Sequence, residues 1–367
     1  MAKLGMPTIN IAFEEAGIEA IERSKHGILA LVLEDTAAAS LKEKNFTVYG
    51  VEDIPAELSE ENKDYITKAL LGYVRAPYRV KVFVIAKGAD EEKYKAVMQE
   101  LNNDIWDYLA VPNLVKEDQE LFVAWIKGLR DNKSKKVKMI MAGKDADYEG
   151  IINIGNEYVM VDDKKYTGAQ FAPRLGGLLC GTPMTISATY APVPEVTGCD
   201  VYDVDQQDEK VNKGEFFVWH DGEKYKMSRA INSLVTTTQG KLEAYQTIKT
   251  VDVMDMIYTD IRRTIQDYYV GKYTNDYDNK CLLITAITGY FKELEAARLL
   301  QKEYSEVDID KTAVVNYQMK HGLYTKDELA KMSDLEIKKL DTKKKVFLTA
   351  KVKLLDAMED FDIQVAI

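Results

Sequence analysis

The feature that most constrains this chain is its last stretch, residues 345–367, where apolar and polar side chains alternate in two separate runs. Every second side chain from Val346 to Leu354 is apolar. The second run places three apolar side chains on one face: Ile363, Val365 and Ile367. Alternation with a period of two predicts a β-strand in each run. The polar stretch Asp356–Asp362 between them has no Asn-Gly or Gly-Gly pair, so a tight hairpin does not follow.

A strand at the very end of a chain needs a partner, because unpaired backbone donors and acceptors are costly when they are buried. The exposed edge of a sheet in another molecule can supply that partner. The N-terminal stretch Pro7–Phe13 has the same pattern, with three apolar side chains on one face: Ile9, Ile11 and Phe13. Polar connections, Glu14–Glu22 and Asp356–Asp360, join the two terminal strands to the rest of the chain. We expect Asp356–Asp360 to be a slack hinge.

Composition excludes several classes of protein. The chain has 367 residues, 46% of them hydrophobic and 30% charged, which is typical of an ordinary globular protein with a sizeable core. A net charge of −11 argues against nucleic acid as a partner, and no apolar run is long enough to insert into a membrane. No signal peptide is present, and the three widely spaced cysteines, Cys180, Cys199 and Cys281, indicate reduced buried thiols in a protein made in the cytoplasm.

The first half of the chain alternates strands with helices, which favours an α/β fold with parallel strands. The predicted strands are Ile28–Leu33, Val80–Ile85, Trp106–Ala110, Val137–Ala142 and Ile151–Ile154. The predicted helices are Ser59–Gly72, with Ser59 as its N-cap, Asp90–Leu101, Lys116–Arg130 and Ala169–Cys180.

The second half is more mixed and favours an α+β arrangement. Phe216–Ala230 is predicted to be a hairpin, since Asp221-Gly222 suits a tight turn. Two long amphipathic helices follow, Val251–Tyr269 and Cys281–Gln301, separated by a polar turn at Asn275–Asn279. We expect a strand over Asp308–Tyr317 and a short helix over Thr325–Leu340.

No catalytic, cofactor or metal site emerges from the sequence. His26-Gly27 and Gly181-Thr182-Pro183-Met184 resemble fragments of a subtilisin-type site, but Pro183 stands where the nucleophilic serine should be. No aspartate precedes His26 in the order that such a site requires. The glycines form no phosphate-binding motif, and Gly271 is better explained as a helix C-cap.

An acidic cluster after Cys199 also fails as a site. Its members are Asp200, Asp203, Asp205, Asp208 and Glu209. Calcium-binding loops need a central glycine and a final glutamate, which this cluster lacks, so a solvated loop is the simpler interpretation.

Four segments, in order along the second half, resemble the tail sheath proteins of contractile phage tails, in the form found in Gram-positive phages and phage-tail-like bacteriocins. They are Ala172–Tyr190, Ser228–Thr236, Tyr269–Asn275 and Leu354–Ile367. The first half of the chain resembles this family only in its α/β rhythm.

The resemblance implies a structural protein and not an enzyme. Subunits of this family form stacked hexameric rings around an inner tube and contract to drive the tube through a target envelope. It implies partners: other copies of the chain, the inner tail tube protein, and the baseplate and tail terminator proteins. It also implies a product that is made in the host bacterium and becomes part of a virion or tail-like particle.

The resemblance further implies a domain order. Residues 1–26 and 355–367 would be arms that exchange strands with neighbouring subunits. Residues 27–250 would be a central subtilisin-like α/β domain, and residues 251–354 a C-terminal domain.

Two further interpretations stay open at this point. A lysine cluster comprising Lys331, Lys338, Lys339 and Lys343–Lys345 could face an acidic tube, or could simply be solvated. The alternatives to a sheath are an inactive or unusual α/β hydrolase and a non-contractile assembly scaffold.

Overall fold

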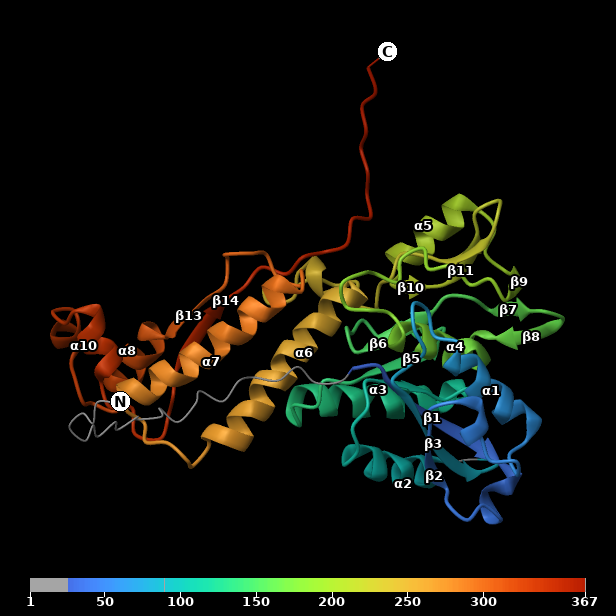
Figure 1. Cartoon of the computed structure of the whole chain (residues 1–367), viewed down its shortest axis with the longest axis horizontal. Coiled ribbons are helices and arrows are strands. Elements are labelled where there is room, and N and C mark those ends of the chain that lie inside the picture. Colours follow the sequence, from blue (N-terminus) through green and yellow to red (C-terminus); the bar gives the residue numbers. More distant parts are fainter. Residues whose placement is uncertain (1–25, 89, 367) are drawn as a thin grey trace, which may run out of the picture. The chain divides into compact units, whose positions relative to one another are not determined.

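The computed structural model describes residues 26–88 and 90–366, and these form two compact units. One unit contains the described residues up to Asp260 together with those from Leu354 onwards, and we call it the central unit. The other unit is Ile261–Lys353. Figure 1 shows the elements of both. These limits lie close to, but do not coincide with, the predicted domain boundaries.

The central unit is built on a seven-stranded sheet with the order β10-β6-β5-β4-β1-β3-β2. All neighbouring strands are parallel except β2, which runs antiparallel to β3 at one edge. The strands are β1 (Ile28–Asp35), β2 (Asn45–Val48), β3 (Arg79–Ala86), β4 (Tyr108–Ala110), β5 (Lys138–Ala142), β6 (Ile151–Ile154) and β10 (Glu215–Phe216). The predicted α/β fold with parallel strands is confirmed, whereas the likeness to subtilisin stays a prediction.

Helices cover both faces of this sheet. They are α1 (Glu60–Leu70), α2 (Glu91–Asn102), α3 (Gln119–Lys127) and α4 (Gly168–Cys180). Side chains of α1 and α4 pack with Leu29, Leu31 and Leu33 of β1 in one apolar cluster. Those of α2 and α3 pack with Ile28, Ala30 and Val32 in another. Strand β1 is therefore a continuous apolar run, because both of its faces are buried.

Smaller elements complete the central unit. A three-stranded antiparallel sheet has the order β8-β7-β9, and β11 pairs with β12 around the Asp221-Gly222 turn, as predicted. The bounds are β7 (Tyr158–Val161), β8 (Lys164–Thr167), β9 (Val196–Cys199), β11 (Val218–His220), β12 (Tyr225–Met227) and helix α5 (Val204–Asn212).

The second unit consists mainly of helices with one two-stranded sheet. Helix α6 (Ile248–Thr264) starts in the central unit and continues past Asp260. The remaining elements are α7 (Tyr277–Ala296), β13 (Glu306–Ile309), α8 (Lys311–Lys320), α9 (Lys326–Leu329), α10 (Asp334–Lys339) and β14 (Leu348–Lys351). Strands β13 and β14 pair antiparallel.

Three predicted segments were wrong, and side-chain caps explain two of the errors. The strand predicted over Asp308–Tyr317 is mostly helix α8, because the side chain of Asp310 accepts from the N–H of Ala313 and starts the helix. The turn predicted at Asn275–Asn279 already belongs to α7, which Asp276 caps. The acidic stretch predicted as a loop contains α5, from Val204 onwards.

The closest helix packing in the central unit depends on a glycine. A Cβ atom added to Gly177 of α4 would lie 1.9 Å from the carbonyl oxygen of Ala69 in α1, nearer than atoms can approach. The paired glycines of the Leu175–Leu179 stretch are thus a packing requirement and not a phosphate-binding motif.

We expect Gly177→Ala to lower the free energy of unfolding by about 1–3 kcal/mol or more, because α1 and α4 must separate. Gly289→Ala is the matched control, since Gly289 is an exposed glycine within α7 whose added Cβ would meet nothing within 4 Å. It should be stabilising by about 0.5–1 kcal/mol. Urea unfolding followed by circular dichroism measures both, and equal behaviour of the two variants would contradict the packing requirement.

Candidate functional site: the C-terminal arm and its seat

The C-terminal segment divides into two parts that behave differently. We call residues 355–360 the arm root and residues 361–366 the arm tip. The arm tip lies in no strand, and its apolar side chains are exposed to solvent: Phe361 by 69%, Ile363 by 75% and Val365 by 79%. Figure 1 shows it as an extended trace. The other predicted exchange residues, Ile9, Ile11, Phe13 and Ile367, lie outside the described residues.

The arm root is not the slack hinge that the sequence predicted. The ammonium of Lys249 donates to the backbone carbonyl of Leu355. The hydroxyl of Thr250 donates to the carboxylate of Asp356 at 2.8 Å. These contacts hold the beginning of the arm root on the first turn of α6. The polar residues of this segment predicted a loop. In the structure, however, Asp356 among them accepts a hydrogen bond from α6.

The far end of the arm root is held by two other residues of the central unit. The hydroxyl of Thr189 donates to the carboxylate of Glu359 at 2.7 Å. The guanidinium of Arg229 pairs with Asp360 and lies 3.8 Å from Glu359. We call Thr189, Arg229, Lys249 and Thr250 the seat of the arm.

A group of buried charges lies beneath the seat and fixes α6 to the large sheet. Lys138, the first residue of β5, contacts Asp252 at 2.8 Å and Asp255 at 2.6 Å. The guanidinium of Arg130 donates two hydrogen bonds to the carboxylate of Asp255, at 2.8 and 3.1 Å. The hydroxyl of Tyr108 in β4 donates to Asp252. We call these five residues the buried ion-pair cluster.

Each charge in this cluster stabilises the ionised form of its partner. Burial alone would raise the pKa of Asp255, but Lys138 and Arg130 hold it below its usual value. Burial alone would likewise lower the pKa of Lys138, but the two aspartates raise it. At the seat, burial lowers the pKa of Lys249, although Asp356 and Glu359 oppose this.

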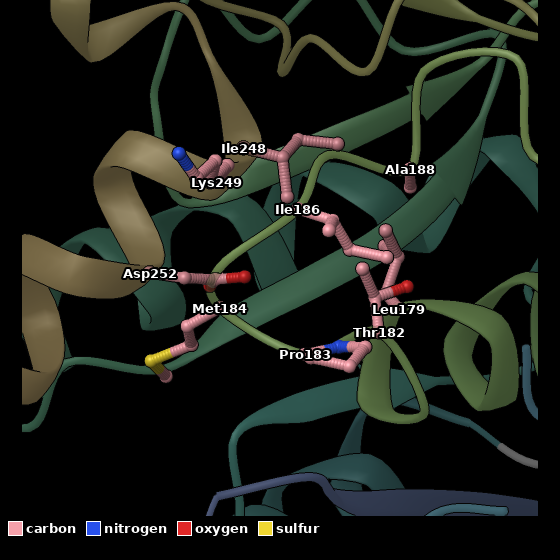
Figure 2. Close-up of a pocket in the computed structure, with 9 residues that line it drawn as sticks. All are labelled: Leu179, Thr182, Pro183, Met184, Ile186, Ala188, Ile248, Lys249 and Asp252. Atoms are coloured by element: carbon pink, nitrogen blue, oxygen red, sulfur yellow. The ribbon is translucent and has the colours of Figure 1, made fainter. Parts of the chain in front are cut away.

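A small hollow lies beside the first turn of α6. Its walls come from the end of α4 and the following loop on one side and from α6 on the other, as Figure 2 shows. The lining residues are Leu179, Thr182, Pro183, Met184, Ile186, Ala188, Ile248, Lys249 and Asp252. The space amounts to about 260 Å³, part of it open solvent, which is less than small-molecule sites usually offer.

The residues that resemble a protease site are neighbours, but they serve the fold. A Cβ on Gly27 would lie 2.5 Å from the carbonyl oxygen of Cys180, so the two stretches meet. Asp107 comes much later in the chain than His26, but its carboxylate lies 3.4 Å from the Nδ1 atom of the His26 imidazole. Its other oxygen accepts from the N–H groups of Gly27 and Ile28, both at 2.8 Å. Asp107 therefore anchors the start of β1.

The electrostatics of this pair agree with a structural role. Burial would lower the pKa of His26, but the hydrogen bond and charge of Asp107 raise it. The hydroxyl of Thr182 donates to the carbonyl oxygen of Leu178 at 2.7 Å. Burial raises the pKa of the Cys180 thiol well above its usual value, which makes it a poor nucleophile.

Within residues 26–88 and 90–366, no group of three or more His, Cys, Asp or Glu side chains gathers in a way that could hold a metal ion. No helix in that part of the chain is both long and apolar enough to cross a membrane. All three cysteines are free, and Cys180 and Cys199 are buried as predicted.

The three predicted tube-contact lysines differ in their surroundings. The ammonium of Lys338 forms an ion pair with the carboxylate of Asp308 in β13, at 2.6 Å. The ammonium of Lys339 lies 5.3 Å from the ring centre of Tyr277. Lys331 is exposed. The structure thus leaves Lys331 and Lys339 more accessible than Lys338.

The sheet of β13 and β14 is the second feature of interest. Its cross-strand pairs Val307–Ala350 and Ile309–Leu348 form an apolar stripe on one face. The sheet has only two strands, so within the described residues β13 and β14 each have one edge that no other strand covers. Strand β14 is shorter than the predicted Val346–Leu354 strand, but it does belong to a sheet of its own subunit.

Sequence reasoning missed the buried ion-pair cluster and the seat. A signal for the cluster exists: Lys138 begins an otherwise apolar strand, and Asp252 and Asp255 are three residues apart on the face of α6 that also carries Val251. An i, i+3 pair shares one helix face. No sequence signal identifies Thr189 or Arg229, because their contact with the arm root joins residues more than 130 positions apart.

Comparison with known proteins gives a consistent result. Residues 87–233 match the family described as "Phage tail sheath protein central domain", and residues 241–367 match "Phage tail sheath C-terminal domain". The "Tail sheath protein" of Clostridium phage phiCD119 is 36% identical over 367 residues, covering 98% of this chain and 99% of that protein. The phage-like element PBSX protein XkdK of Bacillus subtilis is 31% identical over 182 residues, 47% of this chain and 38% of that protein.

Solved structures show the same fold at low identity. The helical sheath of the anti-feeding prophage in its contracted state matches with a TM-score of 0.71 at 13% identity, over 99% of both chains. A sheath tail protein from Desulfitobacterium hafniense matches with a TM-score of 0.68 at 17% identity, over 83% of this chain and 94% of that one.

We expect Asp255→Asn to lower the free energy of unfolding by about 3–5 kcal/mol, because it leaves buried cations without their partner. The pKa of Asp255 lies below its usual 3.8, so its contribution is present above that value and is lost as the pH falls through the folded-state pKa. The variant should therefore lose less stability than the parent on acidification below about pH 4.

Urea unfolding at pH 7 and at pH 3 tests both statements. Glu60→Gln is the control, since it removes an exposed ion pair with Lys63 that should contribute at most about 1 kcal/mol. A loss for Asp255→Asn no larger than that of the control would contradict the importance of the cluster.

Proposed function

The chain belongs to the phage tail sheath protein family, and from this premise we propose that it polymerises as stacked hexameric rings around an inner tube and contracts to drive that tube through a cell envelope. It is a structural subunit of a contractile tail sheath, and the family does not favour the hydrolase or the scaffold alternative. The observation that carries the proposal is the arm tip, an extended segment with exposed apolar side chains that pairs with no strand within residues 26–88 and 90–366.

The arm tip is suited to pairing with the β13–β14 sheet of a neighbouring copy. A third strand at the edge of β14 or β13 would satisfy backbone groups that are otherwise solvated. Its row of Ile363 and Val365 would extend the apolar stripe of that sheet. Lys351, the last residue of β14, and Lys353, which follows the strand, are both exposed, and Asp362 on the arm tip has the opposite charge. Opposite charges on adjacent strands are favourable.

Strand exchange through backbone hydrogen bonds suits a machine that moves. Subunits joined by an extended arm can rotate and slide while the added strand stays paired, whereas a large side-chain interface would have to break. The N-terminal residues Ile9, Ile11 and Phe13 are proposed to take part in the same exchange.

We propose that this chain has no catalytic role. Within the described residues, His26 and Asp107 resemble part of a catalytic triad, but Asp107 accepts hydrogen bonds from the backbone at the start of β1. Pro183 offers no nucleophile. Contraction would then draw its energy from assembly: the extended lattice is metastable and relaxes to one that buries more surface.

The remaining partners follow from the same role. The ends of the polymer would meet baseplate and tail terminator proteins, and its inner surface would meet the tube. The subunits would be made in the cytoplasm of the bacterial host and end in a virion or tail-like particle. Lys331 and Lys339 are the candidates for a weak contact with an acidic tube.

The arm is tested by changing one face of the arm tip. Ile363→Asp and Val365→Asp should each raise the subunit concentration needed for polymerisation about tenfold or more, because each removes an apolar contact of about 1.5–3 kcal/mol. Gln364→Asp is the matched control, since it adds the same charge on the opposite face. Deletion of residues after Asp360 should give a soluble subunit that forms no tubes.

Electron microscopy and sedimentation measure these outcomes. The unaltered chain should form long hollow tubes, whereas discs or shells would favour a scaffold. Normal tubes from the truncated chain would rule out the exchange of the C-terminal arm.

The tube contact is tested by charge reversal at Lys331 and Lys339 together, leaving Lys338 unchanged because it pairs with Asp308. Binding of sheath to preformed tubes in a sedimentation assay should fall several-fold, with the largest effect at low salt. Lys302→Glu is the control, since it is an exposed lysine elsewhere in the same unit. Unchanged co-sedimentation would place the contact elsewhere.

A further inference from the structure

We propose that the seat fixes the register and the pivot of the C-terminal arm, so that a defined tip, starting at Phe361, is presented to the neighbouring subunit. This inference rests on the proposed function for its consequence, but not for its geometry. It replaces a flexible hinge over Asp356–Asp360 with a docked segment and a pivot between Asp360 and Phe361.

The arm root lies on the central unit as an extended segment with two different rows of side chains. Leu355, Ala357 and Glu359 are half-buried, whereas Asp356, Met358 and Asp360 are exposed. The inward row continues with the same period into the apolar row of the arm tip. The only charge in the inward row is Glu359, whose side chain is 15% exposed.

Glu359 is the residue that distinguishes one register from another. The hydroxyl oxygen of Thr189 accepts from the N–H of Ala230 at 2.9 Å, and its own proton is directed to Glu359. At Thr189 the seat therefore offers a hydroxyl donor whose direction is fixed, next to the cationic guanidinium of Arg229. It matches a carboxylate and does not match an apolar side chain.

A slip of the arm by two residues keeps the same face inward but breaks this match. It would bring Ala357 or Phe361 to Thr189 and take Glu359 away from both of its partners. A partly buried carboxylate without partners is costly, so the seat should select one register. An extended segment with only apolar residues on its inward face would not select one register in this way.

The seat also limits how far the arm tip can reach. An arm that pivoted at Leu355 would carry five more residues and reach about 16 Å further. Docking the root thus shortens the tether and reduces the entropy that is lost when the tip pairs with a neighbour.

The charges of the seat are complementary to those of the arm root. Lys249 and Arg229 face Asp356, Glu359 and Asp360, and Lys249 is buried. The Arg229–Asp360 pair is largely exposed and should contribute little alone. Glu359 with Thr189 should contribute most, since it is the least exposed of these contacts.

The proposal is tested on the full chain by nitroxide labels, below the concentration at which it polymerises. Cys281, the one cysteine that is not buried, is first replaced by serine. One label is placed at Met358→Cys in the arm root, whose side chain is 86% exposed, and another at Val365→Cys in the arm tip. The label at 358 should be immobilised and the label at 365 mobile, as measured by the electron paramagnetic resonance line shape.

Glu359→Ala should convert the label at 358 to the mobile spectrum, with about a tenfold rise in the undocked population. Arg229→Gln should have a smaller effect, because the pair of Arg229 with Asp360 is largely exposed. Asp362→Asn is the matched control, because it removes a carboxylate that lies beyond the arm root, and it should leave the spectrum unchanged. Equal mobility at 358 and 365 in the parent chain, or no response to Glu359→Ala, would overturn the proposal.

Polymerisation provides a separate readout. If the seat presents the tip in one register, Glu359→Ala should raise the critical concentration several-fold. A chain that forms no tubes at all would overturn the proposed function but would leave the label spectra, and hence the docking of the root, to be judged independently. Normal assembly by a Glu359→Ala chain whose label at 358 is mobile would overturn the link between docking and assembly.

Discussion

The buried contact of Lys138 and Arg130 with Asp252 and Asp255 is the interaction on which the functional part of this molecule depends. Lys138 starts β5, and the two aspartates lie on the same face of α6. The cluster fixes the beginning of α6 to the large sheet. The first turn of that helix then supplies Lys249 and Thr250 to the arm root. The direction in which the arm leaves is thereby tied to the core through one helix. Buried ion pairs are a weak source of stability but a strong source of specificity in such a position.

The central unit has helices on both faces of a mainly parallel sheet, as many α/β enzymes do. Its buried polar groups, however, have structural roles. His26 and Asp107 meet at the start of β1, the place where a catalytic pair would be of use, yet both oxygens of Asp107 are already engaged. The proposed function accordingly uses strand edges and not a cavity. A polymer that must move requires connections that are strong along the chain and free to rotate, and an exchanged strand on a short tether meets both needs.

The agreement between sequence and structure depends on the range of the forces involved. Strands β1, β3, β5 and β6 and helices α1, α2 and α4 lie within a few residues of where periodicity and caps predict them, because those signals are local. The errors at Asp310 and Asp276 arose where one aspartate could belong to a polar turn or to a helix N-cap, and only the neighbouring packing decides between the two. The arm root was misjudged for a related reason: polar residues predict a loop equally well whether they face water or a partner.

The sequence by itself determined that this chain has parallel strands between helices, and it showed no recognisable catalytic or phosphate-binding motif. It also showed terminal segments in which every second side chain is apolar. Period and composition carry that information directly. Only the tertiary structure decided that residues 355–360 are docked, that Glu359 meets Thr189 and Arg229, and that buried charges fix α6 beneath them. Those contacts join residues about 100 or more positions apart, and their strength depends on burial and distance, neither of which is present in the order of the amino acids.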